Sequence, residues 1–304
     1  MTDQSTKSTA IALLSFTVLV WGAAPAFIRS FSLATGPADA LVIRTIAVAI
    51  PCLLLLPFFG GYIVARKDIP RLLLISLGMF GYFAGSIFGF AYVTSGVGGI
   101  IISTQPLLIA ILASFFGTER INIPTIIGLI ISFAGTLYLF SGDRSATGDD
   151  ENIVAGGSMI FACGAAWAVY VIFSKTLIQT YGSFKITALS SILATLPALA
   201  FTSSSTWQTA RSLDTNGLLA LFYLTFIGTL LTVSTWNFAT ARLQPTTVGA
   251  SLYLIPVLAV ASGVVLLGET VAAPTLVAGG IILFGVAIAQ FGPFIRKNLW
   301  QNSP

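Results

Sequence analysis

Side chains that can bind a small molecule lie inside the long apolar runs of this sequence. Those with a polar aromatic ring are Trp21, Tyr82, Trp167, Tyr170, Trp236 and Tyr253. A Trp or Tyr ring stacks on a flat apolar ring and attracts an ammonium group to its face. Hydroxyl and amide groups stand in the same runs, at Ser86, Ser103, Gln105 and Asn237. Each aromatic residue taken alone is also explained as packing or as an anchor at a membrane interface, but together their mid-run positions favour a binding cavity.

Arg44 is a cation inside the apolar run 37–58. A charge within a membrane-spanning segment is costly, and such a residue is functional by default. Its guanidinium can bind the carboxylate of a ligand. Arg44 also lies near one end of the run, with Asp39 close by, so pairing with Asp39 or extension to the interface is a second interpretation. The sequence leaves both open.

Several classes of chemistry have no residues to carry them. The chain contains no His, and its two cysteines, Cys52 and Cys163, stand singly in apolar runs. This excludes zinc sites, haem attachment and Ser-His or Cys-His catalysis. The sequence contains neither a buried carboxylate pair nor a basic stripe interleaved with exposed aromatic residues. We therefore expect no enzymatic activity, no cofactor, no metal site and no nucleic acid partner.

The elements that must position these residues are membrane-spanning helices. Of the 304 residues, 56% are hydrophobic and 8% are charged, whereas soluble domains carry roughly a quarter charged residues. A helix needs about 20 residues to cross a bilayer, and open strands cannot satisfy their backbone there. The predicted fold class is an all-α membrane protein with ten transmembrane helices. Their ranges are 9–29, 37–58, 71–93, 98–118, 124–141, 153–175, 184–203, 217–240, 246–267 and 274–295.

Basic residues gather on one side of this predicted bundle. If the N-terminus is cytoplasmic, ten of the 14 Lys and Arg residues lie on the cytoplasmic side and three on the other. The excess of basic residues on cytoplasmic loops then places both termini in the cytoplasm. Arg29 and Lys175, at the ends of spans, are interpreted as interfacial anchors. Glu119 and Glu269 end helices on opposite faces, and we expect them to cap basic groups or loop amides.

The two halves of the chain resemble one another. Residues that match at an offset of 150 are Pro106 with Pro256, Glu119 with Glu269, Pro124 with Pro274 and Gly135 with Gly285. Trp21 matches Trp167 at an offset of 146, and these two rings are expected to face each other across the axis that relates the halves. Each half has five spans, an odd number, so the second copy crosses the membrane in the opposite sense. We predict a first repeat at 1–142, a linker at 143–152 and an inverted second repeat at 153–304, an architecture suited to alternating access.

Two sets of motifs carry a family resemblance. In the first half they are Phe90-Ala91-Tyr92, Thr104-Gln105-Pro106-Leu107 and Gly117-Thr118-Glu119-Arg120. In the second half they are Phe238-Ala239-Thr240-Ala241, Leu254-Ile255-Pro256-Val257 and Leu267-Gly268-Glu269-Thr270. Both sets resemble the EamA domain of the drug/metabolite transporter superfamily, and the resemblance covers nearly the whole chain. Within that superfamily, the aromatic residues of the spans are similar to those of the YddG group of aromatic amino acid exporters.

The resemblance implies a transporter that exports aromatic and other neutral amino acids across the inner membrane of a bacterium. Its cavity would be lined mainly by spans 1, 3, 4, 6, 8 and 9. We expect a monomer whose partners are the lipid bilayer and the amino acid. Because no span centre contains Asp, Glu or His, we expect facilitated diffusion rather than proton-driven transport. A carrier of another amphipathic metabolite or of a cationic drug is the alternative.

Prolines and glycines within the spans are candidate hinges or gates. They are Pro25, Gly81, Gly85, Gly89, Pro106 and Pro256. A proline in the middle of a span removes a backbone hydrogen bond and kinks the helix, and the freed carbonyl can bind a ligand. Glycines at every fourth position let two helix backbones approach closely. A static kink and fixed tight packing are the alternative interpretations.

Overall fold

The structure is a computed structural model, and it describes residues 2–116, 123–141, 152–240, 242–243, 251–252 and 254–301. Within these residues the regular structure is entirely helical, which confirms the predicted all-α class. Helix formation satisfies the backbone of each apolar run inside its own segment, as a lipid environment requires. Most of the predicted linker 143–152 and Glu119 lie outside the described residues.

The helices of the first half run as follows: α1 Thr2–Thr35, α2 Pro37–Leu55, η1 Leu56–Phe59, η2 Arg66–Asp68, α3 Ile69–Phe90, α4 Ser95–Ile102, α5 Gln105–Phe115 and α6 Ile123–Ser141. Those of the second half are α7 Ile153–Tyr181, α8 Ser183–Ala198, η4 Leu199–Phe201, α9 Thr206–Arg211, α10 Thr215–Phe222, the π-helical segment η5 Tyr223–Leu231, α11 Thr232–Thr240, α13 Leu254–Leu267 and α14 Ala273–Gln301. Each of the ten predicted segments overlaps one or more of these helices.

Six of the described helical segments are long and apolar enough to cross a membrane. They are Lys7–Thr35, Pro37–Phe59, Arg66–Phe90, Ser95–Phe115, Ile153–Tyr181 and Ser183–Phe201. Four apolar helices are shorter in the described part of the chain: Ile126–Tyr138, Thr215–Leu231, Leu254–Leu267 and Ala273–Ile288. The protein is therefore a multi-pass membrane protein.

The fourth span is interrupted just before Pro106. Helix α4 ends at Ile102, and Pro106 lies in the first turn of α5, where a proline is tolerated because the N–H it lacks would have no partner. The hydroxyls of Ser103 and Thr104 donate to the carbonyls of Ile100 and Ile101, at 2.6 and 2.7 Å. The same two carbonyls also accept the backbone N–H groups of Ser103 and Thr104, whereas the carbonyl that a proline at position 106 frees is that of Ile102, four residues earlier.

The other two prolines lie in different settings. Pro25 is buried inside α1, which continues through it as one helix. Pro256 is buried near the start of α13, whose described residues begin at Leu254. The helix is interrupted at Ser103 and Thr104, directly before Pro106, while both residues keep right-handed helical torsion angles and the apolar span Ser95–Phe115 continues through them.

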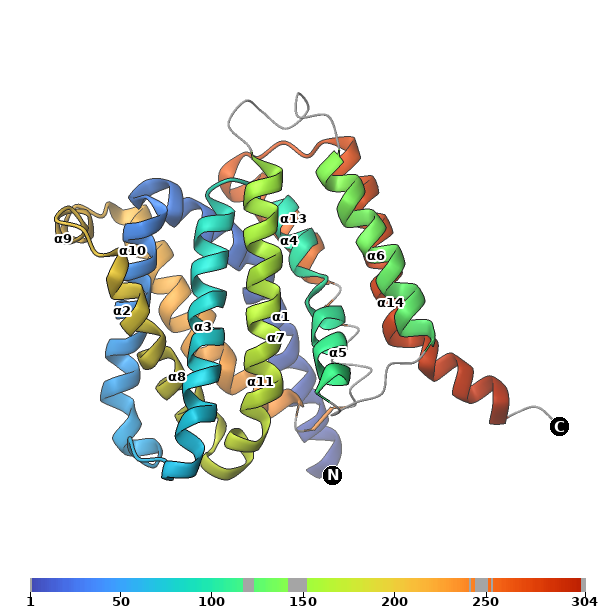
Figure 1. The fold of residues 1–304 in the computed structure, drawn as a ribbon, viewed down its shortest axis with the longest axis horizontal. Helices are drawn as coiled ribbons and strands as arrows, with labels where there is room; N and C mark the ends of the chain where they lie inside the picture. The colour runs from blue at the N-terminus through green and yellow to red at the C-terminus, as the bar shows by residue number, and fades with distance from the viewer. Residues whose placement is uncertain are drawn as a thin grey trace.

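The two halves pack through helices that occupy equivalent positions. Helix α2 packs on α8, α4 on α13 and α6 on α14. In Figure 1 α6 and α14 run antiparallel along one side of the bundle. Two hydrogen bonds across these pairs join residues 150 apart: Ser132 Oγ donates to Ile282 O at 3.0 Å, and Thr195 Oγ1 donates to Thr45 O at 3.2 Å.

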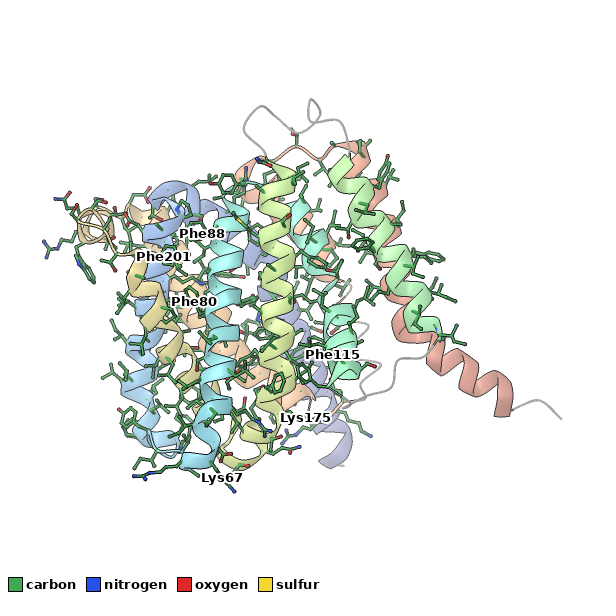
Figure 2. All side chains as sticks on the ribbon, in the orientation of Figure 1. Lys67, Phe80, Phe88, Phe115, Lys175 and Phe201 are labelled. Atoms are coloured by element: carbon green, nitrogen blue, oxygen red, sulfur yellow. The ribbon has the colours of Figure 1, made fainter. Side chains whose placement is uncertain are left out.

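The first helix of each half crosses into the other half. Helix α1 contacts α11 and α13, whereas α7 contacts α3, α4 and α5. Aromatic side chains pack the bundle on the side of α3: in Figure 2 Phe80 and Phe88 lie near Phe201 of η4, with ring centroids 6.4 and 5.7 Å away. The interior therefore belongs to both halves together, and neither half forms a core of its own.

Candidate functional site

A group of three rings lies where α3 meets α7. Tyr82 of α3 lies 5.0 Å from Trp167 of α7, measured between ring centroids, and Trp167 stacks on Tyr170 at 5.1 Å with an interplanar angle of 21°. The Tyr170 hydroxyl forms a 2.9 Å hydrogen bond with the hydroxyl of Thr187 on α8. Three predicted binding residues are thus brought together into one aromatic surface, which we call the α3–α7 ring group.

Arg44 lies beside this group. Its side chain is buried, with 4% of its surface exposed, and its guanidinium carbon is 4.9 Å from the centroid of the Phe83 ring. Neither Nε nor Nη1 has a hydrogen-bond partner. The centroid of the Phe83 ring lies 5.9 Å from that of the Tyr82 ring. A ring face attracts a cation, but it provides no acceptor in the plane of the guanidinium.

The alternative that Arg44 pairs with Asp39 is wrong. The Asp39 carboxylate lies at the start of α2 and binds α9 instead. Its Oδ1 accepts from the Thr206 hydroxyl at 2.6 Å, and its Oδ2 accepts from the Thr209 hydroxyl at 2.8 Å. Two neutral donors therefore satisfy the nearest acidic residue in the sequence, and Arg44 points into the bundle.

A second ring group lies between α1 and α11. The Trp21 ring lies 4.9 Å from that of Trp236, and Trp21 Nε1 donates to the hydroxyl of Thr232 at 3.2 Å. One turn away, the hydroxyls of Thr17 and Thr235 are 2.7 Å apart. We call this the α1–α11 ring group. The Trp faces of this group suit a ligand with a flat ring and an amine.

Trp21 and Trp167 were expected to face each other, but in the described residues each packs on a different ring, and the two occupy equivalent places in the two ring groups. Trp167 packs on Tyr82, and Trp21 binds Thr232, which stands 150 residues after Tyr82. The repeat therefore makes the two sets of contacts equivalent, but it does not bring the two Trp rings together. This pairing could not be seen in the sequence, since an offset identifies equivalent positions but not neighbours in space.

The other predicted polar residues differ in their partners. Ser86 Oγ donates to Phe83 O within α3 at 3.0 Å, and Ser103 Oγ is bound at the α4–α5 break. Gln105 lies against Gly164 of α7, and its Nε2 is buried without a partner. Tyr253 and the side chain of Asn237 lie outside the described residues.

The predicted glycines of α3 lie against α7, in the most extensive helix contact of the described residues. A Cβ atom at Gly85 would lie 2.8 Å from the carbonyl oxygen of Met159, and one at Gly89 would lie 3.0 Å from that of Gly156. At Gly81 the nearest atom is the Ala166 side chain, also at 2.8 Å. The spacing of these glycines thus serves close backbone packing.

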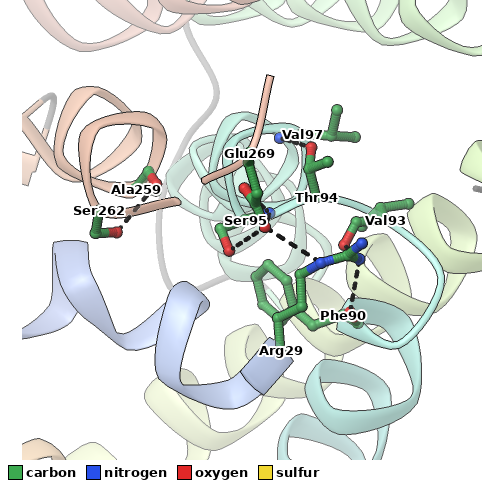
Figure 3. A network of polar contacts seen from close by, with 9 residues as sticks. All are labelled: Arg29, Phe90, Val93, Thr94, Ser95, Val97, Ala259, Ser262 and Glu269. Atoms are coloured by element: carbon green, nitrogen blue, oxygen red, sulfur yellow. Dashed lines mark hydrogen bonds and ion pairs between the residues drawn. The ribbon is translucent and has the colours of Figure 1, made fainter. Parts of the chain in front are cut away.

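A polar network that the sequence analysis did not assemble joins four elements at one end of the bundle (Figure 3). Arg29 Nε of α1 forms an ion pair with Glu269 Oε1 at 3.2 Å, and the guanidinium also donates to the carbonyls of Phe90 and Val93. The Glu269 carboxylate accepts from the backbone N–H of Ser95 at 2.9 Å and from its hydroxyl at 2.9 Å.

This network, Arg29–Ser95–Glu269, changes the interpretation of two residues. Glu269 caps both a basic group and the loop amide that begins α4, as predicted. Arg29 is not merely an interfacial anchor, because its side chain is 16% exposed and holds the carboxylate from the other half of the chain. The signal available in the sequence was the Gly268-Glu269 pair, but its partner stands 240 residues earlier.

Lys185 provides a contrast with Arg44. It is also buried, at 7% exposure, yet its ammonium donates to the carbonyls of Gly60 and Ile63 at 2.7 and 2.8 Å. This cation is fully explained by structure: it ties the loop after η1 to the start of α8.

We expect Lys185→Met to lower the free energy of unfolding by about 2–3 kcal/mol, because two charge-assisted hydrogen bonds are lost and two carbonyls keep no donor. Thermal unfolding in detergent measures the effect. Lys175→Met, on an exposed position of α7, is the control and should leave the melting temperature within about one degree. Equal melting temperatures of the two variants would contradict the assignment.

Comparison with known proteins adds a family and a fold. The sequence profile of the EamA-like transporter family matches this chain twice, over residues 8–141 and 154–290. A "probable amino-acid metabolite efflux pump" of Salmonella typhimurium is 28% identical over 258 residues, which cover 81% of this chain and 85% of the relative. The protein of the same name from Escherichia coli is 25% identical and covers 98% of this chain and 100% of its own length.

A crystal structure shares the fold with a TM-score of 0.61 at 19% sequence identity. The match covers 93% of this chain and 96% of the other. The arrangement of helices described above is therefore one that an experimentally determined structure also adopts.

Proposed function

This chain belongs to the EamA-like transporter family, in the drug/metabolite transporter superfamily, and on that premise we propose that it exports amino acids, aromatic and other neutral ones, by alternating access. It is a transporter and not an enzyme. The observation that carries the proposal is the double match of the family to the two halves, combined with the packing of equivalent helices against each other.

We take the fold to be ten transmembrane helices in two inverted repeats, 1–142 and 153–304, joined by a linker at 143–152. The antiparallel course of α6 and α14 supports the inversion (Figure 1). So does the contact between the loop after the second span and the end of the sixth. There the Tyr181 hydroxyl donates to Asp68 at 2.7 Å and accepts from the N–H of Ala65 at 3.0 Å.

Alternating access requires one face of the bundle to close while the other opens. The network Arg29–Ser95–Glu269 joins α1 and α4 of the first half to the loop after α13 of the second half. Such a contact holds the halves together at one face, and separating it opens that face. The candidate hinges are Pro25, Pro106 and Pro256, which lie in or beside the helices that the network joins.

The two ring groups support a cargo with a flat ring. Each presents Trp and Tyr or Thr side chains in the interior of the bundle, contributed by both halves. The names of the Salmonella and Escherichia relatives, amino-acid metabolite efflux pumps, support an amino acid as that cargo. We assign binding to Trp21, Arg44, Tyr82, Ser86, Ser103, Gln105, Trp167, Tyr170 and Trp236, and we keep Asn237 and Tyr253 as candidates on the sequence alone.

The proposed orientation places both termini in the cytoplasm of a bacterial inner membrane. Figure 2 has Lys67 and Lys175 at the same end of the helices, which is the end where α1 begins. Basic residues favour the cytoplasmic side. With no acidic residue or His at a span centre, we propose a monomer that works by facilitated diffusion.

Counterflow in proteoliposomes tests this function. Vesicles loaded with unlabelled phenylalanine, tryptophan, leucine or alanine should transiently take up the labelled amino acid against its concentration gradient. Empty vesicles should not. If a cationic drug or another metabolite exchanges and no amino acid does, the proposed cargo is wrong. Accumulation driven only by an imposed proton gradient would contradict facilitated diffusion.

We expect Trp21→Ala to raise the half-saturating concentration of an aromatic amino acid by about three- to tenfold, because one stacking partner is lost. Leucine should be affected less. Trp207→Ala is the matched control, since Trp207 lies on α9 with 53% of its surface exposed. An unchanged aromatic KM in Trp21→Ala would remove the α1–α11 ring group from the binding site.

A further inference from the structure

We propose that Arg44 is the anion-binding centre of the cargo site and that the transported molecule must carry a free carboxylate. This proposal rests on the proposed function and specifies its substrate class. It selects zwitterionic amino acids and excludes their esters and the corresponding amines.

The first step is the lack of partners around the Arg44 guanidinium. A guanidinium has five N–H donors and no acceptor. Arg44 is 4% exposed, and within the described part of the chain its Nε and Nη1 have no hydrogen-bond partner. A buried cation without a partner is costly, whereas Lys185 shows how the same chain satisfies a buried cation through two carbonyls. Packing alone does not explain a charge at position 44.

The second step is the charge of the surroundings. Among the described residues, the titratable groups that act on Arg44 are the Tyr82 phenol on α3 and the Cys163 thiol on α7, and neither group carries a negative charge at physiological pH. The nearest carboxylate in sequence, that of Asp39, is bound by Thr206 and Thr209. The site therefore holds an uncompensated positive charge, which an incoming anion would neutralise.

The third step is the geometry of the ligand that fits. A carboxylate forms two parallel hydrogen bonds with one edge of a guanidinium. One edge consists of Nε and Nη2 and the other of Nη1 and Nη2, so each edge of Arg44 includes one of its two open nitrogens. The guanidinium lies over the Phe83 ring, and the Phe83 ring lies 5.9 Å from the Tyr82 ring, measured between centroids. The Tyr82 ring in turn lies 5.0 Å from that of Trp167. A molecule with a carboxylate at Arg44 can rest its side chain and its ammonium on the α3–α7 ring group. A simple anion would contact only Arg44 and not the ring group.

The position of Arg44 also links binding to access. Helix α2 belongs to the first half and α7 to the second, and α3 of the first half lies between their contributions to the site. Because Arg44 is 4% exposed, cargo can reach it only when helices around it move.

The test compares phenylalanine with phenylalanine methyl ester and phenethylamine, which keep the ring and the amine but lack the carboxylate. The wild-type protein should exchange phenylalanine in counterflow and discriminate against both analogues by more than about tenfold. In Arg44→Gln the preference should fall to near unity, with KM for phenylalanine raised by about 10- to 100-fold. Arg44→Lys should keep part of the preference.

Lys185→Met is the matched control, because it removes a buried cation that has its own carbonyl partners. It should lower the melting temperature and leave the preference for phenylalanine over its ester unchanged. An Arg44→Gln protein that keeps the wild-type preference would overturn the proposal, and so would a wild-type protein that exchanges the ester as well as the acid.

A binding measurement keeps the proposal testable if Arg44→Gln folds poorly. Phenylalanine should raise the melting temperature of the detergent-solubilised wild-type protein, and its methyl ester should not; equal shifts would overturn the assignment. If no amino acid exchanges through the wild-type protein, the proposed function fails. The two melting-temperature shifts alone then test whether Arg44 binds an anion.

Discussion

Replacing Gly89 with leucine is expected to prevent stable assembly of the helix bundle. A Cβ at this position would meet Ile160 and lie 3.0 Å from the carbonyl oxygen of Gly156 on α7. The reverse contact is equally close, because a Cβ at Gly156 would lie 2.8 Å from Gly89 O. Backbone atoms cannot move aside as a flexible side chain can, so overpacking here should exceed the usual cost of about 1–3 kcal/mol.

The measurement is the yield of monodisperse protein and its melting temperature in detergent, with a decrease of more than about 10 °C expected for any Gly89→Leu protein that is recovered. Gly280→Leu is the matched control. Gly280 is also a helical glycine, on α14, and a Cβ there has no atom within 4 Å. Its melting temperature should stay within about two degrees of that of the wild type.

The same variant separates fixed packing from a sliding gate on α3. If Gly81, Gly85 and Gly89 serve chiefly as a surface on which α7 slides, then Gly89→Leu should melt like the wild-type protein and fail only in transport. Gly81→Ala gives a milder probe, since its nearest neighbour is the side chain of Ala166. We expect stability and transport to decrease together along the series.

The second large effect is expected for Glu269→Gln. The substitution leaves the guanidinium of Arg29 without its counter-ion in a setting where the two side chains are 16% and 9% exposed. Loss of one partner of a buried ion pair costs about 3–5 kcal/mol. The N–H of Ser95 also loses a charged acceptor at the start of α4. The predicted result is a markedly lower melting temperature.

A double-mutant cycle identifies the cause. Arg29→Gln combined with Glu269→Gln removes both charges, so the double variant should be less destabilised than the sum of the single variants, by about 1–3 kcal/mol. Asp214→Asn is the control, because that carboxylate caps α10 through Gly217 N at 2.8 Å, and its loss should cost about 1 kcal/mol or less. Strict additivity of the two single variants would show that Arg29 and Glu269 do not act as a pair.

The class of this protein and most of its elements could be predicted from the sequence. The composition alone indicates that the protein lies in lipid, and the length of each apolar run indicates a helix. Each predicted segment overlaps a described helix because these properties are local. The capping role of Glu269 was likewise predictable, since a carboxylate at the end of an apolar helix must find a donor nearby.

Contacts between distant segments were not predictable. The offset of the repeat made Trp21 and Trp167 equivalent, but helix packing paired Trp21 with Trp236 and Trp167 with Tyr82. Thr232, whose hydroxyl accepts from Trp21 Nε1, stands 211 residues after that ring in the sequence. Which of several local solutions the chain adopts depends on what packs against it.

Arg44 shows where this division falls. The sequence established that a cation lies inside an apolar run and that Asp39 stands within reach of it. Only the tertiary structure decided that Asp39 is bound by α9 and that the guanidinium turns toward the ring of Phe83. The reason is physical: the sequence shows only that a charge lies in an apolar run, whereas the burial of that charge and the groups that could offset its cost both depend on helices far away in the chain.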